Sequence, residues 1–219
     1  METTPYILKE FSPFSLETTI SETKLFFNET SFSHFPVVSK KLLIGLISKT
    51  DVESIDENEK EIGYFQYLYN FFNSEEDNNI LELLAIFAAN ETNIIPLINA
   101  KKEYIGYYDL IDILHLLNET PFLKNEGISL HLEKETSAFS FSEICQIVES
   151  SKGKIHGLFI SESTASMVNI TLKFSAKNVN EILQSFRRYN YQINSKHKED
   201  FYLEDLKERS NYLQKYLNI

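Results

Sequence analysis

The sequence is nearly free of cysteine. Cys145 is its only cysteine among 219 residues, which excludes an internal disulfide framework and a cysteine-based zinc site. The chain also lacks an apolar run near the ~20 residues that a membrane-spanning helix needs. Its first residues, Met1 to Pro5, have neither the basic segment nor the apolar core of a signal peptide. We therefore expect a soluble, cytoplasmic protein with no membrane partner.

Positive charge is also scarce. The chain carries 21 lysine and arginine residues against 32 aspartate and glutamate residues, for a net charge of −11. Such a chain repels the phosphate backbone of nucleic acids and anionic lipid surfaces, so we expect neither as a partner. An acidic protein can still bind a nucleotide at a local site, because helix N-termini supply local positive potential.

Catalytic and metal-binding motifs are missing too. The five histidines have no His-x-x-x-His or Glu-x-x-His spacing, so the sequence supports no metal site. There is no Gly-x-Ser-x-Gly elbow, no phosphate-binding P-loop and no Rossmann fingerprint. Cys145 falls on an apolar helical face, where we expect a buried and inert thiol. We predict that the protein is not an enzyme and has no catalytic residue and no tightly bound cofactor.

What the sequence does contain is a short motif from Gly45 to Asp51. The motif follows an apolar run at 42–44, which predicts a strand, a tight turn and a helix start. Gly45 would let a backbone come close to a ligand. Ser48 could donate to a phosphate, and Asp51 could accept hydrogen bonds from two ribose hydroxyls. A structural interpretation stays open, because Ser48 and Asp51 also have the spacing of a helix cap.

The motif recurs within a repeat of sixty residues. Four aligned pairs define the repeat: Ile20 with Ile80, Glu22 with Glu82, Phe27 with Phe87, and Pro36 with Pro96. Each copy predicts a helix, a strand entered through proline, a turn with two lysines, a second strand and a new helix start. Gly106 stands where Gly45 does, with one residue more in the turn. Two similar β-β-α units are hard to produce by chance, so we predict a tandem repeat.

The order of these elements, with the x-Pro-Val strand and the Gly-h-h-[Ser/Thr]-x-x-Asp motif, resembles the CBS domain. The two copies together resemble a CBS pair, or Bateman module, which we expect over residues 1–122 with repeats at about 8–60 and 72–122. The resemblance implies an adenosyl ligand such as AMP, ADP or ATP. It implies ligand contacts in the first copy at Gly45, Ser48 (phosphate), Asp51 (ribose), and near Thr19, Phe35 and Val37 (adenine).

The second copy departs from this pattern. It keeps Gly106 and Asp112 as candidate ligand contacts but has Asp109 where the hydroxyl belongs. A carboxylate that faces a phosphate costs on the order of 1–4 kcal/mol at ~4 Å. We therefore expect no phosphate against Asp109. The second cleft could be empty, bind an uncharged adenosine moiety or use a bridging cation.

The last third of the chain predicts a further domain. Its apolar patterns indicate strand, helix, strand, strand, helix and strand between residues 128 and 193. This βαββαβ order is ferredoxin-like, and with the Ser151–Lys154 stretch it resembles an ACT domain, expected over 127–196. Residues 200–219 predict a final helix with a leucine stripe. The predicted fold class is α+β.

A CBS pair followed by an ACT-like domain is similar to the acetoin-utilisation-type regulatory proteins of bacteria. The resemblance implies a non-catalytic sensor of an adenine nucleotide or adenosine derivative, with the ACT-like domain for dimerisation or signal transfer. We expect a homodimer that regulates a protein on another chain. Two alternatives stay open: a structural or interaction module that binds no ligand, and an amino-acid sensor. The effector loop implied by the ACT resemblance, Glu133–Ser140, lacks the Asp-x-x-Gly pattern of amino-acid-sensing members, which favours dimerisation.

Overall fold

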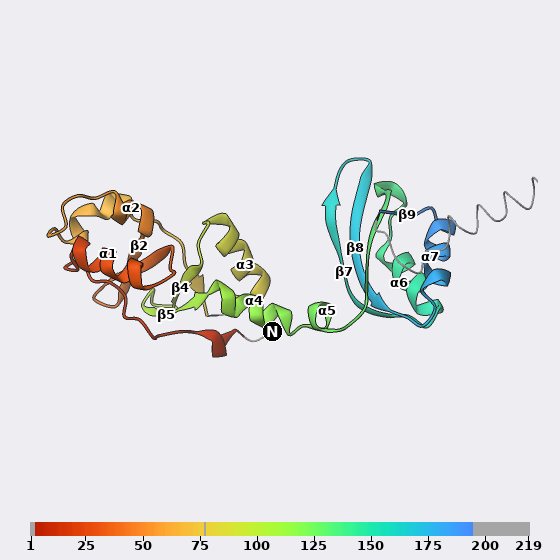
Figure 1. The fold of residues 1–219 in the computed structure, drawn as a ribbon, viewed down its shortest axis with the longest axis horizontal. Coiled ribbons are helices and arrows are strands. Elements are labelled where there is room, and N and C mark those ends of the chain that lie inside the picture. Colours follow the sequence, from red (N-terminus) through yellow and green to blue (C-terminus); the bar gives the residue numbers. More distant parts are fainter. Residues whose placement is uncertain (1–2, 77, 195–219) are drawn as a thin grey trace, which may run out of the picture. The chain divides into compact units, whose positions relative to one another are not determined.

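The structure is a computed structural model that describes residues 3–76 and 78–194. The chain divides into two compact units, Met1–Asn118 and Glu119–Ile219, and both contain helices and sheets (Figure 1). The predicted α+β class is confirmed. The helix predicted at 200–219 and the last two residues of the domain predicted over 127–196 lie outside the described residues.

The first repeat consists of a helix, a hairpin and a short helix. In chain order these are α1 (Ile20–Glu29), β1 (His34–Ser39), β2 (Leu42–Ser48) and α2 (Lys49–Glu53). Thr19 begins α1 with a capping box: its side chain accepts a hydrogen bond from the Glu22 amide, and the Glu22 carboxylate accepts one from the Thr19 amide. Lys40 and Lys41 form the two-residue hairpin turn with positive φ angles, which suit the twist of the paired strands.

The second repeat has the same elements after a short additional strand. They are β3 (Ser74–Glu75), α3 (Ile80–Ala89), β4 (Ile94–Ile98), β5 (Tyr104–Asp109) and α4 (Leu110–Asn118). Asn79 caps α3 with Glu82 as Thr19 caps α1 with Glu22. The same local signals thus start the corresponding helix in both copies.

The N-terminal segment connects the two repeats. After a 3-10 turn, η1 (Thr4–Tyr6), Leu8 pairs with Tyr107 of β5, with N···O distances of 2.8 and 3.0 Å. Six residues later Phe14 pairs with Val37 of β1. One extended segment therefore adds backbone hydrogen bonds to the hairpins of both repeats.

The segment between the repeats makes the matching connection. After the 3-10 segment η2 (Ile62–Leu68), Asn70 pairs with Leu46 of β2, with N···O distances of 2.8 and 2.9 Å. Ser74 of β3 then pairs in parallel with Leu97 of β4. Because both connecting segments pair with both repeats, residues up to Asn118 form one unit.

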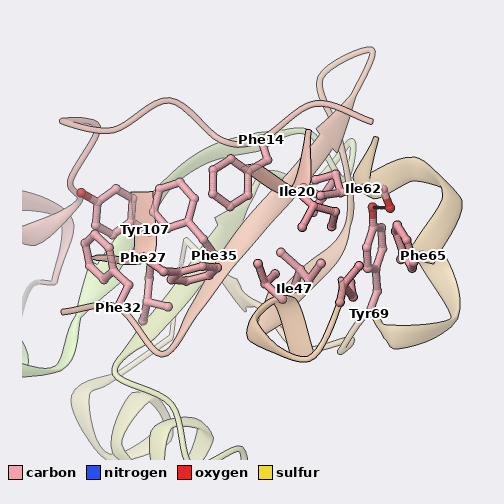
Figure 2. Close-up of a cluster of buried hydrophobic side chains, with 14 residues drawn as sticks. Phe14, Ile20, Phe27, Phe32, Phe35, Ile47, Ile62, Phe65, Tyr69 and Tyr107 are labelled. Atoms are coloured by element: carbon pink, nitrogen blue, oxygen red, sulfur yellow. Dashed lines mark hydrogen bonds between the residues drawn. The ribbon is translucent and has the colours of Figure 1, made fainter. Parts of the chain in front are cut away.

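Aromatic side chains fill the core of the first repeat (Figure 2). The ring of Phe14 lies 5.1 Å from that of Phe35 and 6.1 Å from that of Phe27, both edge-on. Tyr107 comes from β5 of the second repeat, and its ring meets Phe32 at 5.6 Å. The first core therefore includes a side chain of the second repeat.

The C-terminal unit has the predicted ferredoxin-like order. Its main elements are β6 (Ile128–Glu135), α6 (Phe141–Ser150), β7 (Lys154–Ser163), β8 (Met167–Ser175), α7 (Val179–Arg188) and β9 (Gln192–Ile193). The short helices α5 (Pro121–Lys124) and η3 (Thr136–Ala138) flank β6. The strands form an antiparallel sheet in the order β7-β8-β6-β9, which is the strand order of a βαββαβ fold.

One face of this sheet carries the core of the unit. α6 and α7 cover that face (Figure 1), where Val148 and Ile182 pack with strand residues such as Leu130 and Leu172. β8 alternates as predicted, with every second side chain from Val168 to Phe174 buried. The expectation of a buried Cys145 was wrong: the thiol is partly exposed, because the buried stripe of α6 runs through Ile144, Ile147 and Val148.

Candidate functional site

A polar pocket of about 500 Å³ opens at the end of the first hairpin. It is lined by Ser33, His34, Ser48, Lys49, Thr50, Asp51, Asn70, Asn90 and Glu91. The pocket brings together two residues that the sequence predicted, Ser48 and Asp51. It also contains residues from the connecting segment and the second repeat, which the local motif did not indicate.

Ser48 and Asp51 are joined by two hydrogen bonds. The Ser48 hydroxyl accepts from the Asp51 amide at 3.0 Å and donates to the Asp51 Oδ2 at 2.5 Å. Ser48 is only 5% exposed, so the structure supports the helix-cap interpretation of this residue. An ionised carboxylate has about four lone-pair sites. Asp51 therefore retains acceptor capacity for ligand hydroxyls after the bond from Ser48.

His34 at the start of β1 is a pocket residue that the sequence analysis missed. Its Nδ1 lies 3.0 Å from the Ser33 hydroxyl, and its ring meets Phe72 edge-on at 5.7 Å. Ser33 also donates to Asn93 Oδ1 at 3.1 Å. This network orients the imidazole beside Asp51. No local motif signals His34, because Asn93 and Phe72 come from distant parts of the chain.

The N-terminal unit should become less stable as pH falls below about 6.5. Burial lowers the pKa of His34 below its ordinary value of 6.5, although the Asp51 carboxylate opposes this shift. Between the pKa of His34 in the unfolded chain and its lower pKa in the folded chain, the unfolded chain binds more protons. Lowering the pH through this range therefore favours unfolding. Urea unfolding between about pH 5 and 7.5 tests this. His34→Gln should remove the contribution of His34 to the pH dependence of the unfolding free energy. An unchanged pH dependence in this variant would contradict the prediction.

The two predicted glycines have a packing role in this structure. A Cβ on Gly45 would lie 3.0 Å from Tyr69 Cβ and 3.2 Å from the Asn70 carbonyl oxygen. A Cβ on Gly106 would lie 2.7 Å from the Leu8 carbonyl oxygen. In each case a neighbouring backbone segment lies where a Cβ would stand, and the ligand contacts of both glycines stay predictions. Close approach of backbone to backbone is itself a reason for glycine.

The three residues predicted near adenine lie outside the set that lines this pocket. Thr19 caps α1, and the side chains of Phe35 and Val37 are fully buried in the first core. Only backbone groups of these two strand residues could contact a ligand. Their role in binding stays a prediction.

In the second repeat, Asp109 acts as a helix cap. Its Oδ1 accepts a hydrogen bond from the Ile111 amide at 2.8 Å, and Asp112 lies in the first turn of α4. Asp109 thus substitutes for Ser48 structurally, since either side chain can accept from a backbone amide. Ligand contacts of Gly106 and Asp112 stay a prediction.

The C-terminal unit has a second pocket, of about 720 Å³, beside the end of β6. Its lining includes Lys134, which is buried, forms an ion pair with Glu143 and lies 4.1 Å from the ring centre of Tyr191. Burial works against ionisation of Glu143, but hydrogen bonds from Lys134 and Tyr191 prevail and hold its pKa below the usual value. Burial and the Glu143 carboxylate raise the pKa of Tyr191. Glu143 is thus ionised at neutral pH.

Within 3–76 and 78–194, no group of three or more His, Cys, Asp or Glu side chains is arranged to hold a metal ion. No helix in that part of the chain combines the length and the hydropathy needed to cross a membrane.

A curated relative and several solved structures resemble parts of the chain. MJ0188, an uncharacterised protein of Methanocaldococcus jannaschii, is 24% identical over 140 residues, or 59% of this chain and 53% of MJ0188. The chain thus spans about half the length of that relative. A CBS domain pair/ACT domain protein from Thermotoga maritima is 18% identical, with a TM-score of 0.48 over 54% of this chain and 98% of that one. CBSX2, solved in complex with AMP, is 14% identical, with a TM-score of 0.46 over 53% and 95%.

A family model gives the more specific result. The CBS domain model matches residues 7–56, which contain α1, the β1–β2 hairpin and α2. The second repeat has the same order of elements after the sixty-residue shift. Residues 7–56 thus match the CBS domain in sequence, and the second repeat has the same order of elements as the first.

Proposed function

We propose that the protein is a non-catalytic regulator that senses an adenine nucleotide or adenosine derivative through the pocket of its first repeat. The two repeats act as a CBS pair. The ferredoxin-like unit serves as an ACT-like domain that dimerises the chain or passes on the signal, and the regulated protein lies on another chain.

The juxtaposition of Asp51 and His34 in one pocket carries this proposal. Asp51 supplies carboxylate acceptors of the kind that bind paired ribose hydroxyls. His34 adds a half-buried, planar side chain at the same opening. The volume of about 500 Å³ lies within the range of small-molecule sites. The pocket also joins the first repeat to Asn70 and to Glu91, so a bound ligand could stabilise one arrangement of the repeats over another.

Asp51→Asn should abolish most adenosyl ligand binding without unfolding the protein. The amide keeps an oxygen that can accept from Ser48, but it loses the charge that strengthens hydrogen bonds to ribose hydroxyls. A charged hydrogen bond contributes about 1.5–3 kcal/mol, so affinity should fall at least tenfold. A thermal-shift screen with adenosine, AMP, ADP, ATP and S-adenosylmethionine measures this.

The control variant is Asp56→Asn, which removes an exposed acid outside the pocket. It should keep the wild-type ligand shift. If Asp51→Asn and Asp56→Asn respond equally to every ligand, Asp51 does not contact the ligand. A well-folded wild type that no adenosyl compound stabilises would favour a module that binds no small ligand.

The pocket of the C-terminal unit favours a second candidate function, the sensing of an amino acid. Glu133 and Glu135 line it together with Arg188. This combination offers partners for both the ammonium and the carboxylate group of a free amino acid. Stabilisation by amino acids, lost in Arg188→Gln and absent with nucleotides, would support this candidate over the first.

A further inference from the structure

The pocket of the first repeat is poor in free positive charge. Its ionised lining residues are Lys49, Asp51 and Glu91, which give one positive and two negative charges. The pKa of His34 is lowered, chiefly by burial, so its imidazole adds no charge at neutral pH. The net charge of the lining is therefore −1.

The single cation is already engaged. The Lys49 ammonium donates to the Phe27 carbonyl oxygen at 3.2 Å and lies 3.9 Å from the Glu53 carboxylate. The ammonium thus already has polar partners on α1 and α2. A chain of ligand phosphates would thus find no unpaired ammonium among the residues that line this pocket.

The hydroxyl expected to meet a phosphate is engaged as well. The Ser48 hydroxyl donates a hydrogen bond to the Asp51 carboxylate, and its oxygen lies 3.0 Å from the Thr50 hydroxyl oxygen. A phosphate placed on Ser48 would have to break the bond to Asp51 and would then face that carboxylate. The phosphate and the Asp51 carboxylate, both negative, would repel each other at that distance. A ribose hydroxyl has no such conflict, because it can donate to Asp51.

Glu91 adds a second acid from the opposite repeat. It lies between α3 and β4 with a φ of +48°, a left-handed conformation that glycine or asparagine adopts more readily after a helix. Glutamate is therefore not the residue type that this position after the helix favours. Glu91 lines the pocket, where its negative charge repels anions.

From these charges we infer that the pocket selects adenosyl ligands with at most one phosphate, including cationic ones such as S-adenosylmethionine, over ADP and ATP. The inference rests on the proposed function, since it specifies the ligand of the same site. Each added phosphate brings negative charge into a pocket whose fixed charge is already negative. The discrimination should weaken at high salt, because Glu91 is exposed and ions screen it.

Isothermal titration of the full chain with adenosine, AMP, ATP and S-adenosylmethionine, at low salt and without divalent cations, tests this inference. AMP should bind wild type at least about tenfold more tightly than ATP. Glu91→Gln should improve ATP binding about threefold to tenfold and leave adenosine binding within about twofold. Glu59→Gln, which removes an exposed acid outside the pocket, should change neither.

The outcomes separate the two claims. The inference is overturned if ATP binds as tightly as AMP. It is also overturned if Glu91→Gln leaves the ratio of the AMP and ATP affinities unchanged. Either outcome leaves the proposed adenosyl sensor in place. Binding of none of the four compounds overturns the proposed function and the inference with it.

Discussion

Glu143→Ala should lower the free energy of unfolding of the C-terminal unit by about 3 kcal/mol. The side chain of Lys134 is 8% exposed and that of its partner Glu143 is 28% exposed. Removal of the carboxylate leaves the ammonium buried without its counter-charge, next to the ring of Tyr191. An uncompensated buried charge is costly because little solvent can replace the lost partner. Urea unfolding followed by circular dichroism at neutral pH measures the effect.

An exposed ion pair of the N-terminal unit gives the comparison for this variant. Lys60 and Glu57 form an ion pair of 2.8 Å in which both side chains are 53% exposed. Glu57→Ala should therefore lower the unfolding free energy of its own unit far less than Glu143→Ala lowers that of the C-terminal unit. Replacing both buried partners, as Lys134→Met with Glu143→Leu, should recover most of the loss. If Glu143→Ala is no more harmful than Glu57→Ala, the buried pair does not stabilise this unit.

Gly106→Ala should destabilise the N-terminal unit by about 2–4 kcal/mol. Gly106 has a φ of +150°, and a Cβ there would lie 2.7 Å from both the Leu8 carbonyl oxygen and the Ile7 Cγ2. The N-terminal segment would have to move off β5, which would weaken its two hydrogen bonds with Tyr107. Differential scanning calorimetry would resolve the transition of this unit.

Gly45→Ala is the comparison for this prediction. Its Cβ would approach its nearest neighbour, Tyr69 Cβ, only to 3.0 Å, so the loss should be smaller than for Gly106→Ala. Equal stability of Gly106→Ala and wild type would contradict the packing role of the connecting segment.

Local signals in the sequence predicted the elements of both repeats. Thr19 with Glu22 and Asn79 with Glu82 are capping boxes that act within one turn. The alternation of β8 likewise needs only its own residues. The pairing of Leu8 with Tyr107 was not predictable in this way. It joins residues far apart in the chain, and neither segment carries a pattern that names its partner.

The same distinction applies to the pocket. Ser48 and Asp51 lie three positions apart, so their spacing indicated that they act together. His34, Asn70 and Glu91 reach the pocket from three other segments, and only the fold brings them there. The predicted contacts of Phe35 and Val37 were harder to judge, because a strand buried on both faces does not reveal which backbone groups remain accessible.

The most direct test of the sensing function is to locate the ligand by amide chemical shifts in solution. Adenosine or AMP added to the full chain should shift the amides of His34, Asp51 and Glu91 most strongly, and Asp51→Asn should suppress these changes. Changes confined to residues around the C-terminal pocket, such as Glu133 and Tyr189, or no changes at saturating ligand, would contradict adenosyl binding at the first repeat.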